Sequence, residues 1–294
     1  MDRRTFLTAV PAVWSAASLT RSGSLALALQ EQDDAALCRS KFEIAVSRKL
    51  ADGPIGDAVV EIGKTFLGTP YLASALEVPG EERLVVNMRG LDCVSFYENA
   101  LTLARCIKLG TMTFEDYKSQ LQWIRYRDAK INGYPSRLHY TSDYFYDNAR
   151  RGTWKEMSRD LGGEVFVNTV SYMSNHPDSY RQIKDDPKLV PVIAEQEKAI
   201  NVRTRYYIPK EKVKEIENRL QNGDILGTTT NFPGLDTSHT GIVIKEDGVT
   251  KFMHAPLAGK QVLISEKPLH AYLAANKGQT GIMVVRPLEP ANRK

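Results

Sequence analysis

The order of the predicted secondary-structure elements is the feature that most constrains the fold of this chain. Apolar residues at helical spacing recur within residues 33–67 and 92–126, and five short β-rich runs separated by Gly, Asn and Asp turns follow residue 223. Helices first and a series of strands afterwards indicate an α+β fold and not alternating α/β units. We therefore expect helices packed on an antiparallel sheet.

The clearest predicted helix covers residues 92–109. Asp92 is a good N-cap and Gly110 a good C-terminal stop, and the helix is apolar on so much of its circumference that it should be buried. Eight of the 13 tyrosines fall between Tyr117 and Tyr180, and residues 111–220 predict a large, mostly helical insertion that walls a groove. The other predictions are helices at 33–50, 55–67, 114–126 and 210–220, and strands at 224–229, 240–245, 250–254, 261–265 and 281–286.

The N-terminus has the layout of an export signal. A long uncharged run follows Arg3 and Arg4, and a small-x-small site ends at Ala28. The paired arginines resemble those of twin-arginine signals, which bacteria use to export folded proteins. A cytoplasmic N-terminal helix is the alternative, and a proline within the run disfavours it. We expect a twin-arginine-like signal peptide at residues 1–28, a single domain at 29–294, and a periplasmic location.

Charge and hydropathy exclude two classes of partner. The formal net charge is +4, from 39 Lys and Arg against 35 Asp and Glu. Removing the three Arg and one Asp of residues 1–28 leaves +2, which is too balanced for a nucleic-acid binder. No stretch reaches the ~20 apolar residues that span a bilayer, so we expect no stable membrane insertion. The sequence leaves the oligomeric state open.

The three cysteines, an odd number, leave at least one thiol without an intramolecular partner. Cys38 and Cys106 could form one disulfide, and the sequence leaves this open. Cys93 falls in the first turn of the buried helix, where the helix dipole and free N–H groups favour the thiolate. The alternative for Cys93 is a small buried apolar residue.

Two histidines lie on neighbouring predicted strands. If the strands form a hairpin through residues 246–248, His239 and His254 lie near the same end of the sheet. One imidazole could then take the proton of Cys93 while the other orients it, or the two could be unrelated structural histidines. The five histidines show no metal-ligand spacing, so we expect no metal and no cofactor.

Four segments in this order resemble the NlpC-type, papain-like peptidoglycan hydrolases. Their pattern is a Tyr after Pro, an Asp-Cys-Ser-Gly helix start, a Ser-His-Val-Gly-Ile strand and an Ile-His-Ala strand. The matching segments here are Gly68-Thr69-Pro70-Tyr71, Leu91-Asp92-Cys93-Val94-Ser95-Phe96, Ser238-His239-Thr240-Gly241-Ile242 and Met253-His254-Ala255. Further segments at 134–140, 222–225 and 279–283 look like the N-acetylmuramoyl-L-alanine amidase-like branch. The resemblance covers most of residues 55–287, although Val94-Ser95 replaces Ser-Gly and the insertion is longer than in minimal members.

The resemblance implies a papain-like α+β fold and a cysteine amidase. The substrate would be a soluble muropeptide or peptidoglycan fragment, cut between N-acetylmuramic acid and L-alanine. Cys93 would be the nucleophile, His239 the base and then the acid, and His254 the residue that orients His239. Tyr71 would help to hold the oxyanion, unless it is simply a core aromatic residue. The alternatives are an endopeptidase that cuts within the stem peptide and a wall-binding module with an inactive site.

A second cluster follows Gly133-Tyr134-Pro135 within the insertion. Arg137 could clamp a peptide carboxylate and Tyr140 could stack on a sugar, with His139 between them. The alternative is a turn with an internally paired arginine. We therefore name Arg137, His139 and Tyr140 as candidate substrate-binding residues.

Overall fold

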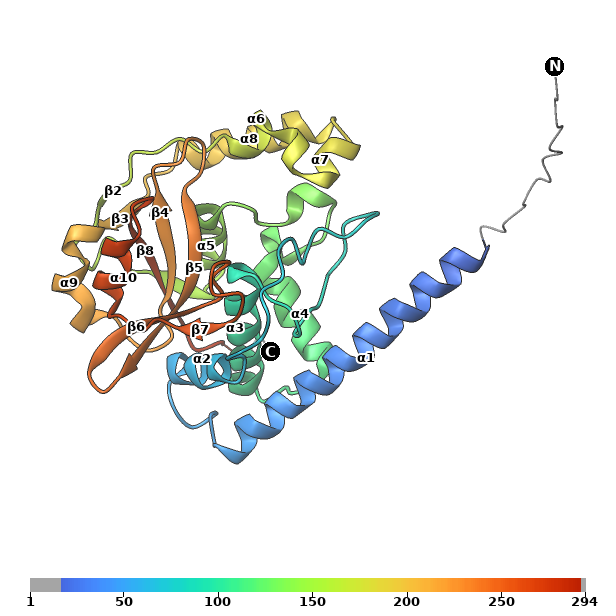
Figure 1. Cartoon of the computed structure of the whole chain (residues 1–294), viewed down its shortest axis with the longest axis horizontal. Coiled ribbons are helices and arrows are strands. Elements are labelled where there is room, and N and C mark those ends of the chain that lie inside the picture. The colour runs from blue at the N-terminus through green and yellow to red at the C-terminus, as the bar shows by residue number, and fades with distance from the viewer. Residues whose placement is uncertain (1–16, 292–294) are drawn as a thin grey trace, which may run out of the picture.

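The structure, a computed structural model, describes the backbone of residues 17–291 and the side chains of residues 30–291. In this part of the chain an eight-stranded antiparallel sheet has the order β2-β3-β8-β4-β5-β6-β7, with β1 also paired to β8 (Figure 1). The strands are β1 (Trp154–Glu156), β2 (Glu164–Val165), β3 (Tyr206–Pro209), β4 (Ile225–Thr230), β5 (Thr237–Glu246), β6 (Val249–His254), β7 (Leu263–Ile264) and β8 (Gln279–Pro287).

Helices lie on both faces of the sheet and along its edge (Figure 1). None of those in the described residues is both long and apolar enough to cross a bilayer. The helices are α1 (Ala17–Ser47), α2 (Ile55–Lys64), α3 (Cys93–Leu109), α4 (Phe114–Arg125), α5 (Thr141–Arg150), α6 (Tyr172–Asn175), α7 (Arg181–Asp185), α8 (Leu189–Asn201), α9 (Val213–Ile216) and α10 (Leu269–Ala275). The predicted α+β class is confirmed.

The apolar core has one part on each face of the sheet, because side chains along a strand alternate in direction. On β5, Ile242 and Ile244 pack into a cluster with α2 and α3, whereas Val243 packs with residues of α9 and α10 on the other face. All three side chains are fully buried. Because successive side chains of a strand point to opposite faces, β5 presents apolar residues to both layers. The sheet is therefore covered on both sides along this part of β5.

Helix α3 begins and ends as its sequence predicts. The Asp92 carboxylate accepts hydrogen bonds from the N–H groups of Val94 and Ser95, and the Ser95 hydroxyl accepts from the Asp92 N–H. This reciprocal capping satisfies amides that the helix itself leaves without partners. At the other end Gly110 adopts a left-handed conformation with φ of 72°. Every residue from Ser95 to Ile107 is buried, so the expected buried central helix is present.

The predicted hairpin is also present. Strands β5 and β6 pair in register from Ile242 opposite Met253 to Glu246 opposite Val249. Asp247 and Gly248, with φ of 50° and 79°, make the two-residue turn between them. Positive φ at both positions matches the twist of the flanking strands. The register brings the two candidate histidines toward one end of the sheet.

Two predictions for the middle of the chain need correction. The helix expected at 210–220 is broken into α9 and two flanking 3-10 turns, Lys210–Lys212 and Glu217–Arg219. The region 111–220 is mostly helical, but β1 and β3 within it pair directly with β8. These strands are only three and four residues long, too short for a clear alternation in the sequence. They anchor the insertion to the sheet.

The structure describes only part of the predicted N-terminal export signal. Arg3 and Arg4 of the predicted export signal lie outside them. Helix α1 runs through the predicted cleavage position at Ala28, and its later part packs on the body, where Cys38 is fully buried. Cys38, Cys93 and Cys106 are all free thiols, so the structure contains no Cys38–Cys106 disulfide among its described residues.

Candidate active site

The candidate nucleophile is the first residue of α3. Cys93 follows the Asp92 cap directly, and its side chain is partly exposed at the floor of a cleft. The expected preference for the thiolate is wrong for the resting structure. Burial, and secondly the Asp92 carboxylate, raise the pKa of Cys93 to about 11, against weaker lowering by the nearby hydroxyl and N–H of Thr240. A neutral thiol is the resting form, because desolvation penalises the anion more than nearby donors stabilise it.

The two candidate histidines form a hydrogen-bonded pair. Nε2 of His239 lies 2.7 Å from Nδ1 of His254, so one of these nitrogens carries the proton that they share. Burial lowers the pKa of His239 to about 4, and burial together with His239 lowers the pKa of His254 to about 3. Both imidazoles are therefore neutral near pH 7. The bond leaves Nδ1 of His239 available to a group in the cleft.

A glycine and two aromatic rings hold this pair. A Cβ on Gly241 would lie 2.6 Å from the Met253 carbonyl oxygen and 2.7 Å from the Phe252 ring. Only glycine lets these groups approach so closely. The Phe252 ring stacks on His254 with centroids 4.7 Å apart, and Tyr272 meets His254 edge-on at 5.1 Å. The His254 imidazole is thus fixed on two sides by packing.

Tyr71 reaches the same site from the loop before α3. Its backbone forms an isolated bridge with Leu91, and its N–H donates to the Lys260 carbonyl. This pairing places Tyr71 beside the residues that lead into α3. Burial, and then the charges that a Cys93 thiolate and the Asp92 carboxylate carry, raise the pKa of the Tyr71 hydroxyl, so the hydroxyl remains a hydrogen-bond donor near the thiol.

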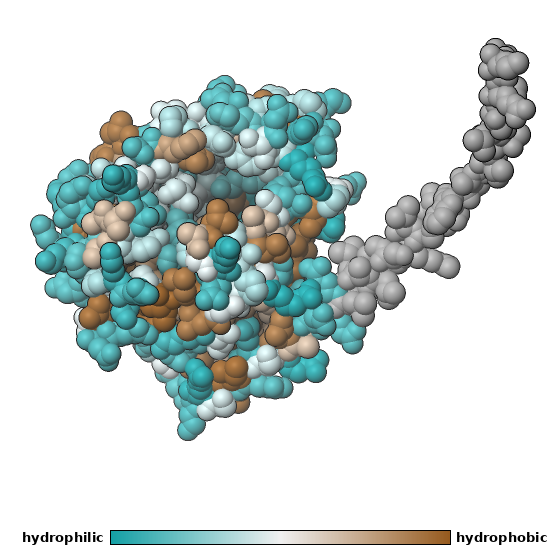
Figure 2. All heavy atoms as spheres, viewed as in Figure 1, coloured by the Kyte–Doolittle hydropathy of each residue, from teal (hydrophilic) through white to brown (hydrophobic). Residues whose placement is uncertain are grey.

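The cleft has a volume of about 200 Å³. In Figure 2 the surface is hollowed below the segment that carries α6–α8. Two of the three predicted binding residues, His139 and Tyr140, line the cleft from the turn that leads into α5. The complete lining is Cys93, Val94, His139, Tyr140, Thr141, Met173, Tyr180, Leu235, Asp236, Thr237, Ser238, His239 and Thr240. Elements far apart in the chain therefore meet around Cys93.

Tyr140 and His139 are held by the protein itself. The Tyr140 hydroxyl donates to Glu197 at 2.6 Å and accepts from the Met173 N–H, and its side chain is 6% exposed. The His139 ring lies 4.4 Å from Tyr134, and burial followed by the Arg137 charge lowers its pKa to about 3. Tyr140 is therefore too deeply buried to present an open ring face on which a sugar could stack.

Arg137 lies in a smaller chamber beside the cleft, with His139 and Val94 common to both. Its guanidinium contacts Glu77 at 2.8 Å and Glu82 at 3.3 Å, and its side chain is 5% exposed. Two protein carboxylates thus already surround the charge. This geometry fits the alternative of an internally paired arginine better than a carboxylate clamp.

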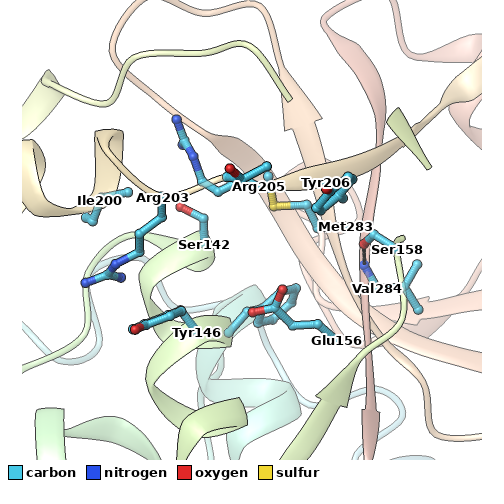
Figure 3. A pocket seen from close by; sticks show the side chains of 12 residues that line it. Ser142, Tyr146, Glu156, Ser158, Ile200, Arg203, Arg205, Tyr206, Met283 and Val284 are labelled. Carbon is cyan, nitrogen blue, oxygen red and sulfur yellow. Dashed lines mark hydrogen bonds between the residues drawn. The ribbon is translucent and has the colours of Figure 1, made fainter. Parts of the chain in front are cut away.

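A second pocket of about 200 Å³ shares no lining residue with the cleft (Figure 3). Its lining includes Ser142, whose N–H donates to Asp236 in the wall of the cleft. Figure 3 shows Glu156 facing Ser142 and Arg203 across this pocket. It contains none of the predicted site residues. Within the described chain, moreover, no group of three or more His, Cys, Asp and Glu could hold a metal ion.

Sequence reasoning missed several residues around the thiol. Tyr272 on α10 packs on His254, and burial and the charge of a Cys93 thiolate raise its pKa, but no motif surrounds it in the sequence. Met173 and Tyr180 of the insertion close the cleft, and their only sequence signal is the density of aromatic residues there. Asp236 anchors the start of β5 through its bond to Ser142. These contacts depend on tertiary packing.

Comparisons with known proteins agree with this arrangement. A profile of the N-acetylmuramoyl-L-alanine amidase-like family matches residues 61–282. The structure of an N-acetylmuramoyl-L-alanine amidase from Bacteroides uniformis ATCC 8492 is 34% identical, with a TM-score of 0.75 over 79% of this chain and 98% of the other. A putative xylanase from Bacteroides fragilis is 38% identical, with a TM-score of 0.73 over 77% of this chain and 99% of the other.

A protein from Legionella pneumophila shares the fold, with 21% identity and a TM-score of 0.66 over 89% of this chain and 96% of the other. No protein with a curated description is significantly similar. The family profile covers α3, the β5–β6 hairpin and the insertion between them. This chain therefore belongs to the N-acetylmuramoyl-L-alanine amidase-like family.

Proposed function

We propose that this chain is a cysteine amidase with a papain-like fold. It hydrolyses the amide between N-acetylmuramic acid and L-alanine in soluble muropeptides, during cell-wall turnover or recycling. The observation that carries the proposal is the cleft lined by both Cys93, at the start of α3, and His239. The His239 imidazole is in turn hydrogen-bonded to that of His254. Membership in an amidase-like family supports the substrate class.

The neutral resting forms of the thiol and imidazole determine the first step. Because burial raises the pKa of Cys93 and lowers that of His239, proton transfer from Sγ to Nδ1 of His239 accompanies attack on the lactyl carbonyl. The C–S bond forms as the carbonyl π electrons move to oxygen. Tyr71 and the Cys93 N–H donate to this oxyanion, and each such donor is typically worth about 10²–10³ in rate.

The remaining steps return the enzyme to its starting state. His239 gives its proton to the L-alanine nitrogen as the C–N bond breaks, which leaves a lactyl thioester on Cys93. A water molecule then attacks the thioester while His239 accepts its proton, and the thiol is restored as the lactyl acid leaves. His254 accepts the Nε2–H of His239 throughout and keeps Nδ1 directed at the reacting atoms.

The insertion supports selection of small substrates. Met173 and Tyr180 from the insertion close one side of the cleft, and His139 and Tyr140 form another. A cleft of about 200 Å³ has less room than the ~300–1,000 Å³ typical of drug-sized ligands. We infer that it takes the end of a short muropeptide and not a strand of intact wall.

The lining of the cleft does not favour a glycosidase. Glycoside hydrolases generally use two carboxylic acids, one on either side of the scissile bond. Asp236 is the one carboxylate among the described lining residues, and its oxygens accept hydrogen bonds from the N–H groups of Ser142 and Thr237. The thiol and imidazole pair therefore accounts better for catalysis in this cleft.

The test is digestion of a purified disaccharide-peptide, with the products identified by mass spectrometry. Release of a peptide with a free L-alanine amine is expected from the wild type, and Cys93→Ala and His239→Ala should each abolish it. Cys38→Ala, at a buried thiol outside the cleft, is the matched control and should remain active. Cleavage within the peptide would instead identify an endopeptidase. An inert wild type that still binds the muropeptide would identify a binding module.

A further inference from the structure

Thr240 carries a buried hydroxyl that the resting structure does not use. The residue follows His239 on β5, is 2% exposed and lines the cleft with Cys93. Its Oγ1 is buried and has no hydrogen-bond partner among the described residues. Leaving a buried hydroxyl without a partner costs roughly as much as a lost hydrogen bond, so such a group needs an explanation.

The position of Thr240 on β5 directs this hydroxyl toward α3. Ile242, two residues further on, packs into the cluster that contains α3, and residues two apart on a strand share a face. Thr240 therefore faces the end of α3 at which Cys93 lies. Both the N–H and the hydroxyl of Thr240 act on the thiol as donors that favour its charged form.

The sequence points to the same hydroxyl. The Ser-His-Val-Gly-Ile pattern of the wider superfamily has Val where this chain has Thr240 in Ser238-His239-Thr240-Gly241-Ile242. Valine and threonine have nearly the same shape, so packing alone does not call for the hydroxyl. Valine at this position would remove the cost of the unpartnered group.

We propose that Thr240 is a further catalytic residue, whose hydroxyl donates a hydrogen bond to Sγ of Cys93 as negative charge develops on the sulfur. This inference rests on the proposed function of Cys93 as nucleophile. The hydroxyl has no partner while the thiol is neutral and gains one when the thiolate forms. No covalent bond of Thr240 changes, since the proton stays on Oγ1 while the Cys93 proton goes to His239.

Such a donor lowers the barrier because it stabilises the charged sulfur and not the resting thiol. A hydrogen bond to a charged group in a buried site corresponds to about a 10- to 100-fold effect on an equilibrium or rate. Thr240→Val should therefore raise the ionisation midpoint of Cys93 by about one to two pH units and reduce kcat about 10- to 100-fold. KM should stay within about twofold.

Two readouts test this proposal. The rate at which iodoacetamide alkylates Cys93 is measured against pH, with Cys93→Ala giving the background from the two buried thiols. In parallel, kcat and KM are measured on the disaccharide-peptide. Thr240→Ser keeps the hydroxyl and should stay within about threefold of the wild type in kcat. Thr102→Val is the matched control, because Thr102 on α3 also has a buried hydroxyl without a partner in the described residues but lies outside the cleft.

The outcomes separate this inference from the proposed function. If Thr240→Val matches the wild type in both readouts, or if Thr102→Val shifts the alkylation profile equally, the inference is overturned. If the wild type does not hydrolyse the muropeptide but Thr240→Val still shifts the alkylation profile, the proposed function fails and thiolate stabilisation by Thr240 stands. A thermal unfolding scan tests whether Thr240→Val is folded. If it is unfolded, kcat and the alkylation profile of Thr240→Ser are compared with those of the wild type instead, and a loss of more than about threefold in kcat would overturn the inference.

Discussion

Acid should destabilise this protein through His254, and substitution of that residue should reveal it. His254 is 2% exposed, and burial together with the neighbouring His239 lowers its pKa to about 3. In the unfolded chain a histidine titrates near its ordinary value of about 6.5. The unfolded state therefore binds more protons than the folded state below that pH. The stability that neutral His254 confers is complete above pH 6.5 and is lost as the pH falls toward 3.

The magnitude follows from these two pKa values. At pH 4.5 the unfolded histidine is almost fully protonated and the folded one almost fully neutral. Linkage then gives a loss of about 3 kcal/mol in the free energy of unfolding, relative to pH 7.5. This is a large share of the ~5–15 kcal/mol that stabilises a typical domain. Because His254 is almost fully buried, solvent screening reduces the figure little.

Urea unfolding curves of the wild type and His254→Gln at pH 7.5, 6.0 and 4.5 measure the effect. Glutamine stays neutral over this range. The free energy of unfolding of the wild type, relative to that of His254→Gln, should therefore fall by about 3 kcal/mol between pH 7.5 and pH 4.5. His176→Gln, at an exposed histidine, controls for the substitution itself. If the free energies of unfolding of the wild type and His254→Gln changed equally with pH, burial would not hold His254 neutral. The neutral resting form assigned to His254 would then be wrong.

Three further predictions concern other parts of the molecule. Arg137→Ala should lower the free energy of unfolding by about 3–5 kcal/mol, because it leaves the carboxylates of Glu77 and Glu82 without their cation. Unchanged stability in urea together with a lower kcat/KM for the muropeptide would instead support Arg137 as a clamp for the substrate carboxylate. Gly241→Ala should cost about 1–3 kcal/mol through overpacking against Phe252, measured by thermal unfolding, and wild-type stability would contradict the tight approach. Replacement of Arg3 and Arg4 by Lys should block export by a twin-arginine route, and an unchanged periplasmic fraction would point to another route or to none.

Local sequence signals determined the parts of the fold that depend on near neighbours. The limits of α3 follow from Asp92 and Gly110, whose side chain and backbone act within one turn of the helix. The β5–β6 hairpin follows from two apolar runs and the Asp247-Gly248 turn. These signals were enough to put Cys93 at a helix start and to bring His239 and His254 to adjacent strands. The α+β class follows from the order of such elements.

The tertiary structure decided what each candidate residue can do. Arg137 is paired with Glu77, 60 residues earlier in the chain, and β1 and β3 of the insertion join β8 near the C-terminus. The pKa of Cys93 rises because distant elements bury the thiol more effectively than the adjacent helix start stabilises its anion. Helix capping and turn formation depend on residues a few positions apart, so the sequence predicts them directly. The desolvation of a thiol and the ion-pair partner of an arginine depend on side chains that are distant in the chain and meet only in the folded structure.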